Sequence, residues 1–192
     1  SMTAPDWDGH QTYAQVCLLA TPSRQETLEY LALAWKALAP QGQLLFCVEN
    51  SLGADGWRKR LRPLQPELFS KYHCRVMRFE HQPFPQEILP LDGDPRRLRK
   101  PQEHCDFISC PGLFSWDRLD AGTQRLIEHL PARLPGTGAD FGCGPGLLVR
   151  EALKRQPTRV DAIDVDQRAV AACLANNPDD DRLRTLWLDL CQ

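Results

Sequence analysis

Residues 139–146, Ala-Asp-Phe-Gly-Cys-Gly-Pro-Gly, place three glycines at alternate positions directly after a short apolar run. An amphipathic pattern then begins at Leu147 and continues through Val149 and Leu153. Glycine is needed where a tight turn uses backbone dihedral angles that a side chain forbids. The stretch therefore predicts a strand, a glycine turn and a helix. Such a turn is open to a ligand that lies on the backbone against the positive end of the helix.

Acidic residues follow the predicted strands of this region. Asp140 precedes the glycines, Asp164 follows the strand predicted at residues 159–163, and Asp189 ends a strand predicted at residues 184–188. In nucleoside-binding α/β folds, a carboxylate at the end of the second strand accepts the ribose hydroxyls. Each acid also has a simpler interpretation. Asp140 would cap the glycine turn, Asp164 would be an exposed loop acid, and Asp189 would belong to a disordered chain end.

The glycine spacing, Asp-x-Gly-x-Gly-x-Gly, resembles that of class I S-adenosylmethionine-dependent methyltransferases. It differs from the Gly-x-Gly-x-x-Gly fingerprint of dehydrogenases, which argues against a nicotinamide-dependent oxidoreductase. Pro-Gly-Leu-Phe-Ser at residues 111–115 and Leu-Asp-x-Gly-Thr at residues 119–123 narrow the resemblance. The chain is similar to bacterial ribosomal RNA guanine-N2 methyltransferases that carry a small methyltransferase domain. This resemblance implies an α/β fold with a Rossmann-like class I methyltransferase sheet.

The resemblance implies S-adenosylmethionine as cofactor and gives roles to individual residues. Asp164 would bind the ribose hydroxyls, and Asp189 would lie near the adenine amine. Asp140 would shape the loop or meet the methionine ammonium through water. The expected cofactor-binding residues are Asp140, Gly142, Cys143, Gly144, Gly146, Asp164, Asp189, Phe114 and Thr123. Phe114 and Thr123 belong to the segment that closes over the cofactor, and Cys143 is expected to be a small packing residue.

The same resemblance divides the chain into three parts. Residues 11–81 resemble half of an N-terminal methyltransferase-like domain, residues 82–106 are a linker rich in proline and arginine, and residues 107–192 resemble the cofactor-binding half of a methyltransferase domain. In the family, an Asn-Pro-Pro-Phe motif after the fourth strand holds the target base. This sequence contains no Asn-Pro-Pro and ends at Gln192, so no catalytic residue is assigned. We expect cofactor binding with little or no methyl transfer by this chain alone.

Local patterns predict the elements of the N-terminal part. Residues 13–20 and 43–48 are nearly all apolar, which is typical of strands covered on both faces. A capping box begins at Ser23 and predicts a helix that residues 40–42, Pro-Gln-Gly, bring to an end. Residues 74–79 alternate between polar and apolar side chains, which predicts an antiparallel edge strand.

Two of the predicted strands, at residues 13–20 and 139–141, would be unpaired apolar edges. Such edges pair with other strands. The N-terminal and C-terminal halves of the chain would therefore join as one circularly permuted sheet, either within one chain or between the two chains of a homodimer. Alternatively, they would remain two half-domains. In the permuted sheet, residues 21–23, Thr-Pro-Ser, would stand where the family has Asn-Pro-Pro-Phe.

Two basic groups, at residues 58–62 and 96–100, lie near Trp57 and Trp116. They would meet ribosomal RNA phosphates, with the indole rings stacked on splayed bases. They would alternatively be a solvated helix face, a charged linker and rings at the edge of the core. The alternative function is accordingly a non-catalytic scaffold that binds RNA or a protein partner and keeps a vestigial nucleoside site.

Composition limits the class of protein further. A net charge of −2 excludes a globally basic nucleic-acid binder, although it permits local basic groups. The eight cysteines form no Cys-x-x-Cys pair and match no common zinc spacing, which favours reduced thiols in the cytoplasm and no metal site. No apolar run is long enough to span a bilayer, so no membrane association is expected.

Overall fold

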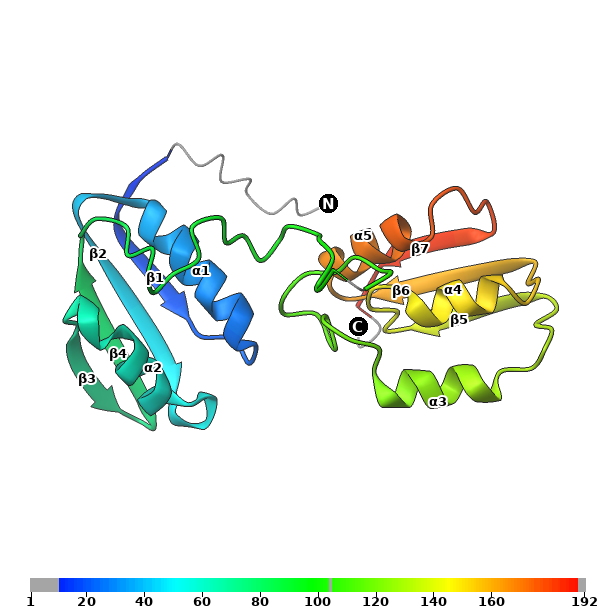
Figure 1. The fold of residues 1–192 in the computed structure, drawn as a ribbon, viewed down its shortest axis with the longest axis horizontal. Coiled ribbons are helices and arrows are strands. Elements are labelled where there is room, and N and C mark those ends of the chain that lie inside the picture. The colour runs from blue at the N-terminus through cyan, green and yellow to red at the C-terminus, as the bar shows by residue number, and fades with distance from the viewer. Residues whose placement is uncertain (1–10, 104, 190–192) are drawn as a thin grey trace. The chain divides into compact units, whose positions relative to one another are not determined.

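The computed structural model describes residues 11–103 and 105–189. The chain divides into two compact units, Ser1–Pro95 and Arg96–Gln192, and the boundary lies inside the predicted linker (Figure 1). Each unit has its own sheet, with strand order β1-β2-β4-β3 in the first and β5-β6-β7 in the second. Within the described residues the strands form these two separate sheets, as in the alternative of two half-domains, and the joining of the halves into one permuted sheet stays a prediction.

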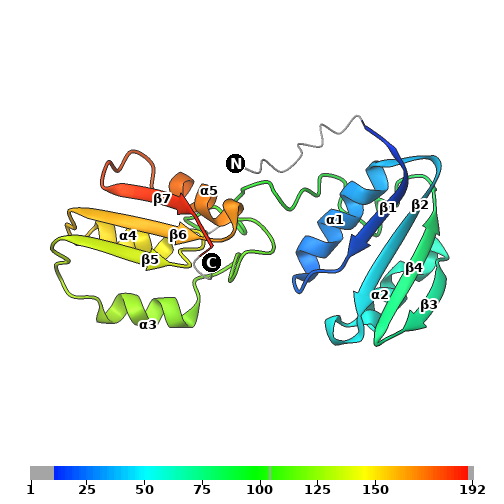
Figure 2. The ribbon, with the colours of Figure 1, turned by 180° about the vertical axis from the view of Figure 1, so that it is seen from behind.

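The first unit combines a mixed sheet with two α-helices. Its elements are β1 (Tyr13–Leu19), α1 (Arg24–Lys36), β2 (Leu38–Glu49), the 3-10 turn η1 (Asn50–Leu52), α2 (Ala54–Leu61), the 3-10 turn η2 (Arg62–Leu64), β3 (Glu67–Lys71) and β4 (Cys74–Glu80). β1 runs parallel to β2, whereas β4 runs antiparallel to both of its neighbours, β2 and β3 (Figure 2). β4 is therefore antiparallel as predicted, but the edge position belongs to β3.

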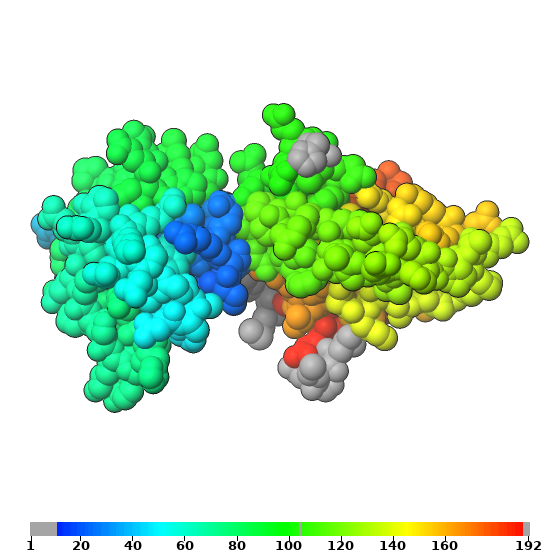
Figure 3. Space-filling model, turned by 60° about the horizontal axis from the view of Figure 1, so that its bottom comes forward, coloured from blue at the N-terminus to red at the C-terminus, as the bar shows by residue number. Residues whose placement is uncertain are grey.

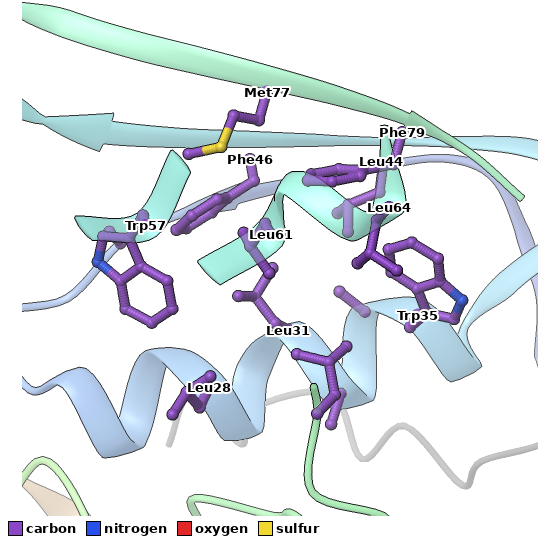
Figure 4. Packing of buried hydrophobic residues seen from close by; sticks show 14 of the residues in the cluster. Leu28, Leu31, Trp35, Leu44, Phe46, Trp57, Leu61, Leu64, Met77 and Phe79 are labelled. Atoms are coloured by element: carbon purple, nitrogen blue, oxygen red, sulfur yellow. The ribbon is translucent and has the colours of Figure 1, made fainter. Parts of the chain in front are cut away.

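The core of this unit lies between the sheet and its two helices (Figure 4). Trp35 of α1 meets Phe79 edge to face at 5.6 Å between ring centroids, and Trp57 of α2 meets Phe46 in the same way at 5.4 Å. Trp57 is only 3% exposed. Of the two predictions for this ring, packing in the core is therefore correct, and stacking on an RNA base is not available to it.

The Thr-Pro-Ser segment after β1 has a structural role at the start of α1. Ser23 is the N-cap, and its Oγ accepts a hydrogen bond from the Glu26 N–H over 3.3 Å. The Thr21 hydroxyl donates to the Ser23 carbonyl over 3.1 Å. These polar groups are therefore used in ending β1 and beginning the helix, as the capping box predicts.

The predicted linker is packed: its first part contributes to the core of the first unit, and its last part contributes to the second unit. Leu89 is 2% exposed in the core of the first unit, where Phe84 and Ile88 also pack. Beyond the boundary, Leu98 packs against a small apolar cluster of the second unit, and Arg99 lies 5.6 Å from the centre of the Trp116 ring. Arg99, a member of the second basic group, therefore interacts with an aromatic ring of its own unit.

The second unit is built on a parallel sheet. Its elements are α3 (Ala121–His129), β5 (Thr137–Phe141), α4 (Leu147–Leu153), β6 (Arg159–Asp164), α5 (Gln167–Asn176) and β7 (Leu183–Trp187). β6 pairs in parallel with β5 on one side and β7 on the other, and buried Val149, Val160 and Cys173 join α4, β6 and α5 in one core. The carboxyl ends of these strands meet at one edge of the sheet, which is where α/β folds of this kind bind ligands.

β1 and β5 are edge strands of their sheets in the described part of the chain. A homodimer through these edges remains a prediction. No helix within residues 11–103 or 105–189 is long and apolar enough to cross a bilayer.

Candidate functional site

A cavity of about 450 Å³ opens beside the carboxyl ends of β5 and β6. The predicted cofactor residues that line it are Asp140, Gly142, Cys143, Gly144, Asp164, Phe114 and Thr123. Sequence reasoning missed several other lining residues, namely Arg118, Leu119, Asp120, Asp166 and Ala169. The structure thus gathers most of the predicted residues around one space, although they come from three separate stretches of the chain.

Gly142 and Gly144 form the part of the cavity wall that is bare backbone. Both have a positive φ, 81° and 51°, and a Cβ atom added to either would meet nothing within 4 Å. The N–H groups of Gly142 and Cys143 both donate to the Ile163 carbonyl, over 2.8 and 3.0 Å. The turn is therefore fixed to the end of β6 while the space above its glycines stays open.

Gly146 has a different role from the other two glycines. It is the N-cap of α4 with φ 78°, and a Cβ atom there would lie 2.6 Å from Cys173 Sγ and 2.9 Å from Asn177 Nδ2. Gly146 lies outside the cavity lining. Its missing side chain lets α4 begin directly against α5, so the structure gives it a packing function.

Asp164 joins the glycine turn to the start of α5. Its Oδ2 accepts from the Gly144 N–H and its Oδ1 accepts from the Asp166 N–H, each over 2.9 Å. A carboxylate has about four acceptor positions, so each oxygen keeps capacity for another donor. The side chain is partly buried, lines the cavity and is fixed by these bonds. It is therefore more than an exposed loop acid.

Asp140 places a second carboxylate in the same cavity. Its Oδ2 is buried and has no hydrogen-bond partner within the described residues. Burial, followed by the negative charge of Asp164, raises the pKa of Asp140 above its ordinary value. Buried polar atoms are normally hydrogen-bonded, and an unpartnered one costs roughly 1–3 kcal/mol. The atom is available to a donor or a cation that enters the cavity, and it does not cap the turn.

The segment of residues 111–123 forms the outer wall and lies at the surface of the second unit, among the green atoms of Figure 3. Phe114 is 77% exposed, which leaves its ring free to cover a ligand. Asp120 caps α3, because its Oδ2 accepts from the Thr123 N–H over 2.9 Å. Thr123 therefore faces the cavity from the first turn of a capped helix.

Two side chains of α5 hold the neighbouring segments in place, and sequence reasoning missed both. Asn176 accepts from the Ile108 N–H over 2.7 Å and donates to the carbonyls of Ile108 and Pro145, each over 2.8 Å. Arg168 donates to the Pro111 carbonyl over 3.3 Å. These bonds connect α5 to the outer wall and to the glycine turn, and no local sequence pattern signals them.

Cys143 is a packing residue, as its size suggests. It is 6% exposed, and a hydrogen bond with Cys173 together with burial raises the pKa of its thiol far above the usual range.

Asp189 is partly buried after β7 and does not line the cavity, so its adenine role stays a prediction. No group of three or more His, Cys, Asp or Glu side chains within the described residues is placed to hold a metal ion.

Comparisons with known proteins agree with this geometry. Residues 104–190 match the family described as Methyltransferase small domain. Ribosomal RNA small subunit methyltransferase C of Shewanella piezotolerans is 34% identical over 179 residues, which are 86% of this chain and 51% of the relative. The protein of the same name from Pseudomonas entomophila is 36% identical over 162 residues, covering 81% of this chain and 48% of the relative. The chain thus spans about half the length of these curated relatives.

A solved structure gives the same fold. It is a 16S rRNA N2 methyltransferase of T. thermophilus in complex with AdoMet and guanosine. It matches 92% of this chain and 50% of its own length with a TM-score of 0.66 and 21% sequence identity. The glycine turn, its two carboxylates and these similarities agree, and residues 104–190 are the part of the chain that matches the methyltransferase small-domain family.

Proposed function

We propose that this chain binds S-adenosylmethionine at the carboxyl edge of β5 and β6 and supplies the cofactor half of a ribosomal RNA guanine-N2 methyltransferase. The observation that carries the proposal is the bare backbone of Gly142 and Gly144 between two carboxylates, Asp140 and Asp164, in one cavity. The substrate class is supported by the names of the relatives and by the nucleoside bound in the T. thermophilus protein.

The residues present fit this cofactor. The cavity of about 450 Å³ is in the size range of small-molecule sites. The buried Oδ2 of Asp140 would accept from the ammonium of the methionine part, directly or through water. Asp164 would use its remaining acceptor positions for the ribose hydroxyls. The exposed ring of Phe114 would cover the ligand from the outer wall.

When bound, S-adenosylmethionine supplies a methyl group that its sulfonium has already activated, so the protein mainly has to align donor and acceptor. In this chain Asp164 holds the glycine turn, and α5 holds the outer wall through the hydrogen bond from Arg168 to the Pro111 carbonyl. The sequence has no Asn-Pro-Pro motif, and the Thr-Pro-Ser segment expected in its place caps α1 instead. We therefore infer that methyl transfer requires a base-holding element that this sequence does not contain.

Isothermal titration with S-adenosylhomocysteine tests the site directly. We expect a dissociation constant in the micromolar range for the unmodified chain. Asp164→Ala should weaken binding at least tenfold, because it removes the ribose acceptor and loosens the turn. Asp181→Ala is the matched control, since this acid is exposed and lies outside the cavity lining. No binding by the unmodified chain would contradict the proposal and favour the non-catalytic scaffold. The cytoplasmic location predicted from the cysteines remains a prediction.

A further inference from the structure

We propose that a basic hollow on the first unit binds the phosphodiester backbone of the RNA substrate, an inference that rests on the proposed function. The hollow has a volume of about 460 Å³ and lies beside the end of α2, the turn η2 and the start of β3. Its lining consists of Arg58, Lys59, Arg62, Gln65, Pro66 and Leu68. The lining thus presents three cationic side chains and no acid within one concave surface.

The acids that border the hollow, Asp55 and Glu67, each have a cationic partner outside it, although Asp55 also forms an ion pair with Arg58 of the lining. Arg75 donates to Asp55 over 2.6 Å, which is shorter than the 3.5 Å that separates Asp55 from Arg58. The hydrogen bond and charge of Arg75 hold the pKa of the Asp55 carboxyl below its ordinary value. Glu67 is paired with Arg78 of β4. The positive charge of the hollow is therefore only partly compensated by its surroundings.

Lys59 and Arg62 carry most of this uncompensated charge. Both are exposed, and in the described part of the chain neither side chain forms a hydrogen bond or an ion pair. A basic run on a helix is often only a solvated face. Here the run borders a cavity whose remaining walls are Gln65, Pro66 and Leu68, which distinguishes it from a convex charged surface.

The backbone that carries these cations is well fixed. Leu61 is 1% exposed and Leu64 is 6% exposed, so the end of α2 and the turn η2 are anchored in the core on either side of Arg62. Gln65 ends η2 with φ 50°, and its N–H donates to the Arg62 carbonyl over 3.0 Å. The backbone positions from which the cationic side chains project are therefore fixed, so binding of phosphate has to order only the side chains.

RNA is the polyanion that these features favour. Arginine binds phosphate through its planar fork and lysine as a point charge. Leu68, which is 44% exposed, adds an apolar wall against which a ribose would pack. Contacts of this kind provide affinity and position without sequence information. The hollow would therefore hold the substrate backbone, while base selection depends on other residues.

The test measures binding of a fluorescent 16S rRNA fragment to the full chain by anisotropy at several salt concentrations. Lys59→Glu/Arg62→Glu should weaken binding at least tenfold at low salt. It should also lower the slope of log affinity against log salt by about 2, since each lost phosphate contact removes about 1. Lys59→Gln/Arg62→Gln should give an intermediate loss and serves as the milder variant. Thermal melting followed by circular dichroism should be unchanged in both variants, because both side chains are exposed.

Arg125→Glu/Arg184→Glu is the charge-matched control, since both side chains are exposed on the second unit. It should change RNA binding less than twofold. Equal weakening by the two reversals, an unchanged salt slope, or no RNA binding by the unmodified chain would overturn the inference. Duplex DNA of equal length should bind more weakly, and equal binding would show a general polyanion site instead. Binding of S-adenosylhomocysteine should be the same in every variant, so a failure of the hollow is distinguishable from a failure of the cofactor site.

Discussion

The close approach of Gly146 to α5 predicts a large loss of stability from one methyl group. In Gly146→Ala, the new Cβ would lie 2.6 Å from Cys173 Sγ and 2.9 Å from Cys173 Cα. The sulfur can rotate away, but relief of the second clash requires that the backbones of α4 and α5 separate. Overpacking of this kind costs about 1–3 kcal/mol. Alanine at φ 78° adds roughly 1–2 kcal/mol of conformational strain.

The free energy of unfolding of the second unit should therefore fall by about 2–5 kcal/mol. For a domain of about 100 residues this corresponds to a Tm that is lower by on the order of 10–30 °C. Hydrogen exchange is the better assay, because it reports α4 and α5 separately from the first unit. Protection of both helices should fall together.

Gly136→Ala separates strain from collision. Gly136 also has a positive φ, 88°, but a Cβ atom there would meet nothing within 4 Å. It should cost only the conformational part, about 1–2 kcal/mol. Adding Cys173→Ala to Gly146→Ala should restore part of the loss, since it removes the sulfur but leaves the clash with the α5 backbone. If Gly146→Ala and Gly136→Ala destabilise the unit equally, the proposed helix collision is refuted.

The second unit also provides three further predictions. Burial and a neighbouring carboxylate raise the pKa of Asp140, so the folded chain keeps the Asp140 carboxyl protonated to a higher pH than the unfolded chain does. The free energy of unfolding should therefore fall as the pH rises from the ordinary pKa of an aspartate to the raised pKa of Asp140. Asp140→Asn should remove this fall in urea unfolding measured across that interval, while weakening binding of S-adenosylhomocysteine at least tenfold. Asn176→Ala should destabilise the second unit by about 1–3 kcal/mol, since it leaves partly buried partners unsatisfied, and should speed exchange of the Ile108 amide. Iodoacetamide should alkylate exposed Cys17 well before Cys143, whose thiol is buried with a raised pKa; equal rates in peptide mass spectra would contradict this.

Elements with local signals were predictable from the sequence. Ser23 caps α1 as the capping box indicates, and β5, the glycine turn and α4 follow the pattern of residues 139–153. In these places a few consecutive residues determine the backbone conformation, either through a side chain that caps a helix or through a residue that adopts a positive φ. The acids at positions 140 and 164 could be located for the same reason, since Asp140 is the penultimate residue of β5 and Asp164 is the last residue of β6.

Features that depend on distant partners could not be predicted. β2 begins at Leu38, earlier than its apolar run suggests, because Tyr13 pairs with Leu38 across a register shift. All five residues of β3 are exposed and show no alternating pattern, yet β3 forms the edge of the sheet by pairing Phe69 with Val76. Asn176 bonds to Ile108, 68 residues away in the sequence, so nothing near either residue signals the interaction.

Two carboxylates in one crevice also influence which ligands it accepts. Burial and, as a smaller cause, the negative charge of Asp164 raise the pKa of Asp140, and a proton bound to Asp140 relieves both the buried charge and the repulsion between the two carboxylates. A positively charged ligand would relieve the repulsion between the carboxylates as well, whereas a neutral ligand of the same shape would not. The crevice should therefore rank nucleoside-like compounds by formal charge before it ranks them by shape.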